Sequence, residues 1–308
     1  MVTEGLAANS RRTYSRGVDK YIEFCTFYRL NPLILSEWNT LRFITHLVDV
    51  GMAPSTIKVY MAGLRAWLIN QGAQDVSLYT QKVKWALKSA ERRAPVPIQA
   101  KPIDYSMLLR IYRFIPLSYF NMVGFTAMLV GYFGCLRAAE YLPDPGQAPP
   151  IYPKDLTIVL DVDPPYAVLL ISTSKTAPKG FKVVLGCTYT KVCSVCWLSH
   201  LLRVRPFNPQ APIFAIARNQ VLSRSQFSRF IRDSMMAASI DPSGYTPHSL
   251  RAGAATRAAI IGRPEADIQS LGRWRSSAYR AYIRPQDQWS ATLSAELATA
   301  QGPNSLLH

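Results

Sequence analysis

The sequence predicts a mainly α-helical protein of two domains that carries one small antiparallel sheet. Apolar residues recur with helical spacing over most of the 308 residues, as expected for helices that bury one face. Residues 94–103 contain three prolines and cannot continue a helix, so they predict a linker between domains at 1–93 and 104–308. Three β-branched runs beyond the linker, separated by turn residues, predict the strands.

Four helices are expected in the first domain. Asn9 and Ser10 can cap the first helix, Pro54 opens the third, and Gly51 and Gly72 end the second and third. The fourth helix sets apolar residues among many lysines and arginines. The expected helices cover 12–27, 41–50, 54–72 and 81–93.

The second domain is expected to pack helices around the sheet. The uncharged stretch 114–136 is long enough to span a membrane, but Pro116 and Asn121 dilute it and it runs into Arg137. We therefore interpret it as a buried core helix, followed by a loop at 143–153. The expected strands cover 156–162, 167–173 and 181–185. The expected helices cover 104–115, 119–141, 193–203, 223–238, 248–261, 264–271 and 276–283.

Composition favours a nucleic-acid-binding protein of a reducing compartment. The net charge is +16, with 13 Lys and Arg against 7 Asp and Glu up to Arg93, and 22 against 12 beyond it. Positive charge in both domains suits a protein that surrounds a polyanion. A hydrophobic content of 49% excludes a disordered tail. Five cysteines fit free thiols, and the N-terminus lacks the features of a signal peptide, so we expect no membrane partner.

The chemical signal lies beyond the linker, in residues that can hold a phosphate. Arg137 precedes Glu140 by three positions, and His248 precedes Arg251 by the same interval. This interval puts two side chains on one helix face, so we expect Glu140 to orient Arg137 and His248 to share a site with Arg251. Guanidinium groups grip phosphate oxygens as a fork. Trp274 can donate its indole N–H to the same group but cannot accept a proton.

A phenol and an ammonium complete the set. Tyr282 and Tyr279 each offer a hydroxyl that can attack phosphorus. Lys175 lies where the second expected strand turns into the third, and an ammonium there can protonate a leaving oxygen. Lys179, in the same loop, is the alternative. Attack on a phosphodiester builds negative charge on the phosphate oxygens, which positioned cations stabilise.

This chain resembles the tyrosine recombinases, because it contains residues like their active-site set in the same order. These residues are Arg137, Lys175, His248, Arg251, Trp274 and Tyr282. The segment 272–284 is most similar to recombinases of eukaryotic mobile elements, such as DIRS-type retrotransposons and Cryptons. The resemblance implies a helical core-binding domain and a catalytic domain that close on DNA as a C-shaped clamp. It also implies that Lys175 is the general acid.

The resemblance further implies a reaction and its partners. One DNA ester is exchanged for a 3′-phosphotyrosine, which a free 5′-hydroxyl later attacks, so neither a metal nor a cofactor is expected. The partner is double-stranded DNA, bound by a homo-oligomer that is a tetramer on two sites. Trp289, Leu293 and Leu297 offer an amphipathic stretch for exchange of a C-terminal helix between protomers. We expect a nuclear protein for a eukaryotic element, and otherwise one of the cytoplasm or nucleoid.

Two tyrosines compete for the nucleophile. Tyr282 begins Tyr-Ile-Arg, the form of the nucleophile segment in the family. Trp274 precedes Tyr282 by eight positions, where many members show about nine, and one residue rotates a helix by about 100°. We predict that Tyr282 attacks and that Tyr279, one turn earlier, packs or binds backbone; Tyr279 stays the alternative nucleophile.

Further basic residues are candidates for contacts with DNA. One group lies on the expected helix 81–93 and another on the helix that begins near Ser223. Such clusters suit phosphate contacts, although a solvated surface would look the same. The candidates are Lys82, Lys84, Lys88, Arg92, Arg93, Lys179, Arg224, Arg229 and Arg232.

Four residues have the spacing of a metal site. Cys187, Cys193, Cys196 and His200 could form a tetrahedral zinc shell. The simpler interpretation is that Cys187 ends a strand while the other three lie on one helix face as small buried residues. We favour the simpler interpretation and predict no metal.

Two other functions stay open. A type IB topoisomerase uses a similar set of residues to relax DNA as a monomer. A domesticated DNA-binding protein could have lost catalysis, although the complete set of candidate residues argues against that loss.

Overall fold

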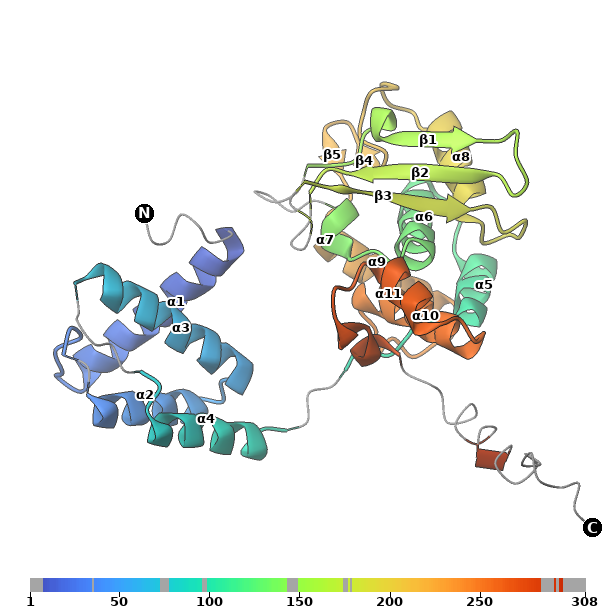
Figure 1. Ribbon diagram of the computed structural model, residues 1–308. Helices are drawn as coiled ribbons and strands as arrows, with labels where there is room; N and C mark the ends of the chain where they lie inside the picture. Colours follow the sequence, from blue (N-terminus) through green and yellow to red (C-terminus); the bar gives the residue numbers. More distant parts are fainter. Residues whose placement is uncertain are drawn as a thin grey trace, which may run out of the picture. The chain divides into compact units, whose positions relative to one another are not determined.

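The chain folds into two compact units, Met1–Pro97 and Ile98–His308. The computed structural model, shown in Figure 1, describes residues 8–34, 36–72, 78–95, 99–142, 149–173, 177, 179–283, 291, 294 and 295. The division falls inside the segment 94–103 that the sequence predicts as the linker. Lys101 and Ile103 of that segment nevertheless belong to the second unit, because their N–H groups donate to the carbonyls of Gly244 and Ser249 at 2.8 and 3.0 Å.

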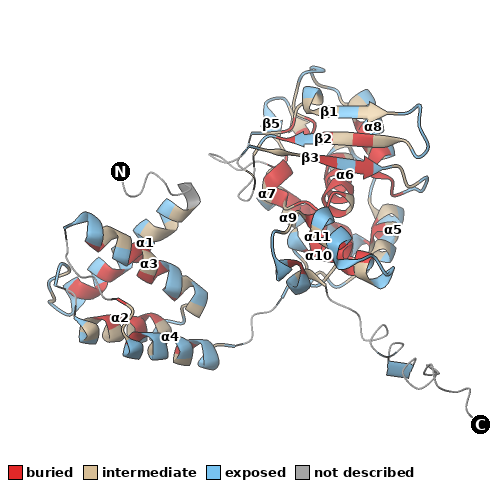
Figure 2. Cartoon of the chain, viewed as in Figure 1, coloured by how far each residue is buried: buried red, intermediate tan, exposed pale blue. Residues whose placement is uncertain are grey.

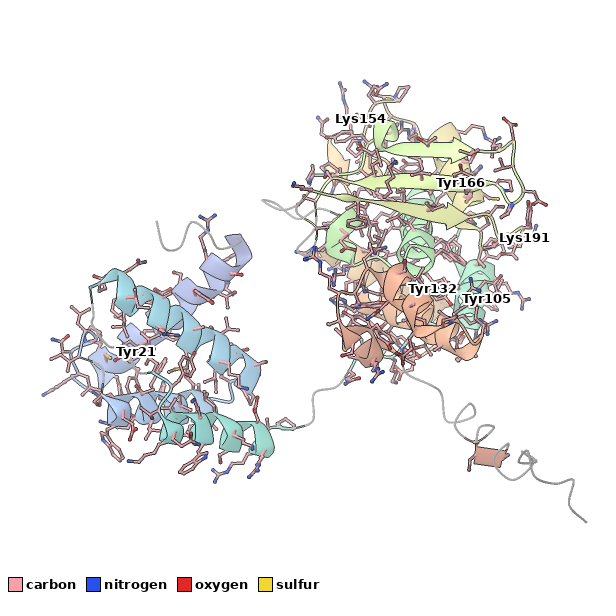
Figure 3. All side chains as sticks on the ribbon, in the orientation of Figure 1. Tyr21, Tyr105, Tyr132, Lys154, Tyr166 and Lys191 are labelled. Atoms are coloured by element: carbon pink, nitrogen blue, oxygen red, sulfur yellow. The ribbon has the colours of Figure 1, made fainter. Side chains whose placement is uncertain are left out.

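The first unit contains the four helices that the sequence predicts. They are α1 (Ala8–Phe27), α2 (Glu37–Asp49), α3 (Pro54–Asn70) and α4 (Gln81–Arg93). α2 begins four residues earlier than expected because the Ser36 hydroxyl accepts the N–H of Asn39 and caps it. An aromatic core joins α1 to α2, with the ring of Phe43 lying 5.1 Å from that of Tyr21 (labelled in Figure 3) and 5.3 Å from that of Phe24.

Helices of the second unit surround one central helix. They are α5 (Tyr105–Phe114), α6 (Tyr119–Phe133), α7 (Ala138–Tyr141), α8 (Ser194–Val204), α9 (Arg224–Ala237), α10 (His248–Ile260) and α11 (Glu265–Gly272), with short 3₁₀ helices η1 (Pro153–Asp155) and η2 (Ser277–Tyr282). α6 is buried at every position from Val123 to Tyr132 (Figure 2) and packs against α8, α9 and α10. It is therefore a core helix, as predicted. No helix among the described residues is long and apolar enough to cross a membrane.

A three-stranded antiparallel sheet covers one end of the second unit, as Figure 1 shows. Its strands are β1 (Leu156–Val159), β2 (Tyr166–Ile171) and β3 (Phe181–Gly186), in the order β1-β2-β3. Ala167, Leu169 and Ile171 alternate into the core, so the predicted sheet is confirmed. A second hairpin, β4 (Ala215–Ala217) and β5 (Gln220–Val221), was not predicted because its strands are too short to show a period.

Two further expected helices differ in the structure. The expected helix 119–141 breaks between α6 and α7, where Cys135 has a φ of 46° and Arg137 is extended. The segment 276–283 forms the 3₁₀ helix η2. A 3₁₀ helix has three residues per turn, so side chains three apart, such as those of Tyr279 and Tyr282, eclipse each other. The rotation of about 100° per residue that holds for an α-helix therefore does not apply to this segment.

Candidate active site

A buried carboxylate gathers three arginines in the second unit. Glu140 is 4% exposed. Its oxygens lie 2.9 Å from Nη1 of Arg137, 3.7 Å from Nη2 of Arg273 and 3.9 Å from Nη1 of Arg251. Arg137 and Arg251, which the sequence predicts to hold one phosphate, therefore meet at a single point. We call these four residues the arginine cluster.

The break between α6 and α7 positions two members of the cluster. Arg137 is the N-terminal cap residue of α7, and its N–H donates to Oε2 of Glu140 at 2.8 Å. Oε1 of the same carboxylate accepts a hydrogen bond from Nη1 of the Arg137 side chain. Glu140 therefore caps α7 and orients Arg137 at the same time. The side chain of Arg137 stays 25% exposed, so its remaining donors can reach a ligand.

Arg251 lies in the first turn of α10 and is 0% exposed. Its Nη1 donates to the carbonyl of Cys135 at 2.8 Å, and its Nη2 donates to the carbonyl of Gly272. The guanidinium carbon lies 4.4 Å from the ring centre of Trp274 and 5.4 Å from that of Tyr282. These cation–π contacts cover the group, so a phosphate reaches it only when the rings move.

Arg273 was missed in the sequence analysis. It ends α11 in the left-handed conformation, with a φ of 56°. Its guanidinium donates to the carbonyls of Gly134 and Cys135 at 3.2 and 3.0 Å. The available signal was spacing, because Arg273 stands nine residues before Tyr282, the interval that we expected of Trp274.

The two candidate nucleophiles have different surroundings. Tyr282 is half-buried at the end of η2, and its ring centre lies 5.0 Å from that of Trp274. Tyr279 is 2% exposed, and its hydroxyl accepts Nε of Arg280 at 3.3 Å. The hydroxyl of Tyr279 and the guanidinium of Arg280 hold the pKa of Glu265 below its usual value. The described contacts therefore put the ring of Tyr282 on Arg251 of the arginine cluster, whereas the ring of Tyr279 lies 6.4 Å from that of Trp274 and its hydroxyl contacts Arg280.

His248 begins α10, one turn before Arg251. Its N–H donates to the hydroxyl of Thr246 at 3.2 Å. The ring keeps an exposed edge, but partial burial and then the positive charges of Arg251, Arg137 and Arg224 lower the pKa of His248. The imidazole is therefore largely neutral at pH 7 and sits within the field of both predicted phosphate-binding arginines.

Trp274 packs directly over Gly272. A Cβ on Gly272 would lie 1.8 Å from the indole, so no other residue fits there without displacing the ring. The indole Nε1 is buried and has no hydrogen-bond partner among the described residues. A buried donor without a partner costs about 1–3 kcal/mol, and a phosphate oxygen would satisfy it.

The lysine candidates lie in the loop between β2 and β3. Lys175 lies outside the described residues, so its part in the site stays a prediction. Lys179 is exposed in the turn before Gly180. The amphipathic stretch with Trp289, Leu293 and Leu297 likewise lies outside the described residues.

The other basic candidates fall into two groups. α4 buries Val83, Leu87 and Ala90 and exposes its charged side, where Lys82 pairs with Glu37 at 3.0 Å. On α9, Arg229 is exposed, while Arg224 is partly buried and acts on His248 through its charge. The exposed candidates of both helices are Lys82, Lys84, Lys88, Arg92, Arg93, Arg229 and Arg232.

Three of the four candidate zinc ligands come together. The Sγ atoms of Cys187, Cys193 and Cys196 lie within 4.8 Å of one another. His200 stands outside this group, with its Nδ1 3.3 Å from the guanidinium of Arg203. Cys193 is buried, but Cys196 and His200 are exposed and Cys187 is half-buried. The interpretation of the helical three as small buried residues is therefore wrong for Cys196 and His200.

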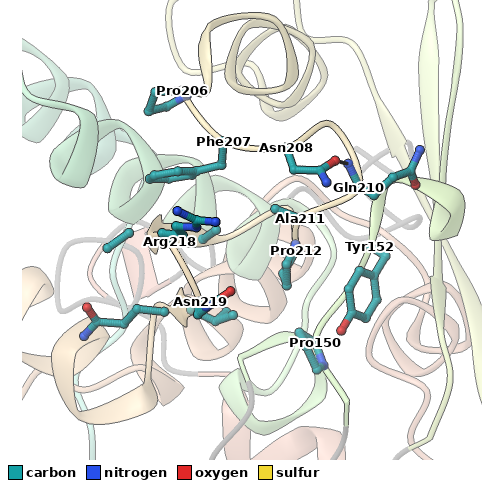
Figure 4. A pocket seen from close by; sticks show the side chains of 14 residues that line it. Pro150, Tyr152, Pro206, Phe207, Asn208, Gln210, Ala211, Pro212, Arg218 and Asn219 are labelled. Atoms are coloured by element: carbon teal, nitrogen blue, oxygen red, sulfur yellow. Dashed lines mark hydrogen bonds between the residues drawn. The ribbon is translucent and has the colours of Figure 1, made fainter.

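A hollow of about 830 Å³ lies apart from the arginine cluster. Figure 4 shows it between the β4–β5 hairpin and the segment 206–212. Among the described residues that line it, Arg218 is the single charged one, and no member of the cluster takes part. The hollow is therefore separate from the arginine cluster.

Comparison with known proteins identifies the fold. No family model and no curated protein matches the chain. Solved structures match at 14–16% identity: XerH site-specific recombinase bound to palindromic difH substrate, with a TM-score of 0.65, covers 93% of this chain and 79% of its own. Tn1549 transposon integrase in complex with transposon right end DNA, with a TM-score of 0.61, covers 96% and 95%.

A lambda integrase tetramer bound to a Holliday junction matches with a TM-score of 0.58 and 16% identity, over 89% of this chain and 74% of its own. The three alignments cover 89–96% of this chain. The protein therefore has the fold of the tyrosine recombinases and integrases.

Proposed function

We propose that this protein is a site-specific DNA recombinase or integrase that cuts and rejoins DNA through a 3′-phosphotyrosine on Tyr282. One observation carries the proposal: three guanidinium groups surround the carboxylate of Glu140, and the ring of Tyr282 lies on one of them, Arg251. Clusters of like charge are costly in the absence of an anion. Guanidinium groups bind phosphate through strong charge-assisted hydrogen bonds.

Charge balance within the cluster supports this chemistry. Three guanidinium groups and one carboxylate leave a net charge of plus two. A phosphodiester attacked by a phenolate forms a five-coordinate phosphorane that carries two negative charges. Positive charge fixed before the reaction stabilises this species without any reorganisation during the step, and it acts most strongly where water is excluded.

The proposed step forms one bond and breaks one bond. The Tyr282 oxygen attacks phosphorus, and the bond from phosphorus to the 5′ oxygen breaks. The phenol proton passes to the neutral ring of His248 or to a phosphate oxygen. The 5′ oxygen leaves with a proton from Lys175. The reverse attack by a 5′-hydroxyl restores the phosphodiester and Tyr282, so the number of ester bonds is conserved.

The proposal requires the aromatic rings to move. Arg251 is fully covered, and its π contacts with Trp274 and Tyr282 would give way to contacts with phosphate. In exchange, the buried Nε of Arg251 and the indole N–H of Trp274, which lack partners among the described residues, would gain acceptors. Both donors favour binding of an anion over the covered state.

We extend the proposal to a mobile-element recombinase that works as a tetramer on two DNA sites. The likeness of the segment 272–284 to DIRS-type and Crypton recombinases supports the element, and the four-protomer assembly of a structural neighbour supports the tetramer. In this proposal α4 and α9 contact the DNA backbone through their exposed basic residues, and the C-terminal stretch is exchanged between protomers.

Covalent trapping tests the proposal without knowledge of the target. The substrate is a pool of nicked duplexes with randomised sequence. Cleavage near the nick releases a short strand that carries the 5′-hydroxyl, so the reverse attack cannot occur. The protein then stays attached to the DNA in detergent. We expect adducts with the natural protein and none with Tyr282→Phe. Tyr279→Phe serves as the matched control and should keep the adduct. An adduct that survives Tyr282→Phe but not Tyr279→Phe would reverse the assignment of the nucleophile.

The trapped sequences then allow the enzyme class to be tested. A recombinase should resolve a synthetic four-way junction built from the selected sequence. Relaxation of supercoiled DNA without resolution would identify a topoisomerase of type IB character instead. DNA binding without any adduct would contradict both and identify a binding protein that lacks catalysis.

A further inference from the structure

Three free thiols form a compact group between the sheet and α8. Cys187 follows the end of β3, Cys193 is the N-terminal cap residue of α8, and Cys196 lies in the first turn of that helix. The Sγ atom of Cys187 lies 3.4 Å from that of Cys193 and 3.9 Å from that of Cys196. None of the three belongs to the arginine cluster or to the mechanism proposed above.

The sulfur separations match those around a tetrahedral metal. With zinc–sulfur bonds of about 2.3 Å, two sulfurs on a tetrahedral ion lie about 3.8 Å apart. The two measured separations lie on either side of this value, and the third is below 4.8 Å. A disulfide, in contrast, would need sulfurs about 2.05 Å apart. The three sulfurs therefore outline one face of a tetrahedron.

Backbone donors are already directed at this group. The Sγ atom of Cys193 accepts the N–H groups of Thr188 and Cys196, both at 3.4 Å. These donors stabilise a sulfur that carries negative charge, as does the N-terminal end of the 11-residue helix α8. Lys191, in the same loop, is exposed at the edge of the unit (labelled in Figure 3) and adds a positive charge nearby.

Simple packing does not account for the arrangement. Cys196 is exposed and Cys187 is half-buried, so neither sulfur is needed to fill the core. His200 follows Cys196 by four residues on α8, and this interval puts both on one helix face. Its Nδ1 now contacts Arg203 at 3.3 Å, and both side chains are exposed. A metal ion at the sulfur group would have to draw the imidazole away from this surface contact.

We propose that Cys187, Cys193 and Cys196 bind a structural zinc ion as thiolates, with His200 as the fourth ligand. Binding releases the three thiol protons to solvent and changes no oxidation state. The ion would join the end of β3 to the start of α8 and so fix the sheet on the helices. This role is separate from DNA cleavage, for which the arginine cluster needs no metal.

Metal analysis of the untagged 308-residue chain tests the site. We expect about one zinc per chain after growth with zinc and purification without chelators, and a higher melting temperature than after chelation. Cys196→Ser should lose the zinc. Ser199→Ala is the matched control, because Ser199 is exposed on the same helix and lies outside the sulfur group, and it should keep the zinc.

Two further measurements complete the test. Titration with zinc should show a loss of affinity of about tenfold or more for His200→Ala; unchanged affinity would overturn His200 as the fourth ligand. A protein without zinc whose five thiols all react with a thiol reagent after denaturation would overturn the site. So would a mass lower by two hydrogens and the loss of two reactive thiols, because these would reveal a disulfide.

Discussion

Removing the negative charge of Glu140 should strongly destabilise the second unit. Glu140→Gln keeps the size of the side chain but leaves the guanidinium groups of Arg137, Arg251 and Arg273 around a neutral amide. At an effective dielectric constant of about 20, two unit charges 4 Å apart interact by about 4 kcal/mol. Loss of one partner from a buried ion pair costs about 3–5 kcal/mol.

We therefore expect Glu140→Gln to lower the free energy of unfolding by about 3–5 kcal/mol. The three attractions are not summed, because Arg137 and Arg273 are partly exposed and solvent screens them. Urea unfolding of the full chain, followed by a signal from the second unit, measures the change. Glu265→Gln is the control, because Glu265 pairs with Arg280 at 3.2 Å on an exposed surface and should show a much smaller change.

Sulfate sharpens this test. An anion that enters the cluster should restore more stability to Glu140→Gln than to the natural protein or to Glu265→Gln at the same sulfate concentration. Equal destabilisation by the two substitutions would refute the reasoning. It would mean that the carboxylate does not hold the arginines together in solution.

Three further predictions follow from single contacts. Gly253→Ala should lower the melting temperature, because the added Cβ would lie 1.8 Å from the carbonyl oxygen of Ile103. Overpacking of this kind costs about 1–3 kcal/mol. An unchanged melting temperature would refute this contact. NMR should give His248 a pKa below 6.5 that rises when phosphate binds. Because the unfolded chain then binds the proton more readily, His248 should lower stability as the pH falls below about 6.5; a raised pKa would contradict this. Replacing Lys84 and Lys88 by alanine should reduce the slope of log K for DNA against log salt by about 2, and an unchanged slope would exclude α4 from the interface.

The sequence indicated most of the fold because its signals are local. Periods of 3.6 and 2 residues identified the helices and the three-stranded sheet. The break after α6 was missed because it depends on distant residues. The carbonyls of Gly134 and Cys135, freed where the helix ends, accept hydrogen bonds from Arg251 and Arg273 more than a hundred positions away. No window along the chain contains both partners.

The candidate site was predicted to a similar extent. Spacing indicated the pair of Arg137 and Glu140, and the resemblance to the tyrosine recombinases implied that Arg251 lies in the same site. It did not identify Arg273, whose guanidinium turns back from a left-handed residue at the end of α11. Nor did it indicate that Trp274 and Tyr282 cover Arg251, because the burial of a side chain depends on the packing of elements that are remote in sequence.

Cysteine spacing gave a similar partial result. The spacing offered Cys187, Cys193, Cys196 and His200 as one set, and the structure brings the three sulfurs together but leaves His200 outside the group. The exposure of Cys196 was not predicted, since helical position alone does not show which face of α8 meets the core.

Mass spectrometry of the trapped adduct tests the central claim most directly. The detergent-stable complex is digested with a protease and a nuclease, and the peptide that carries a residual 3′-phosphonucleotide is sequenced. We predict that the modification lies on Tyr282, whose ring contacts Arg251. A modification on Tyr279 or on any other residue than Tyr282 would contradict the claim that DNA is cleaved by Tyr282 at the arginine cluster.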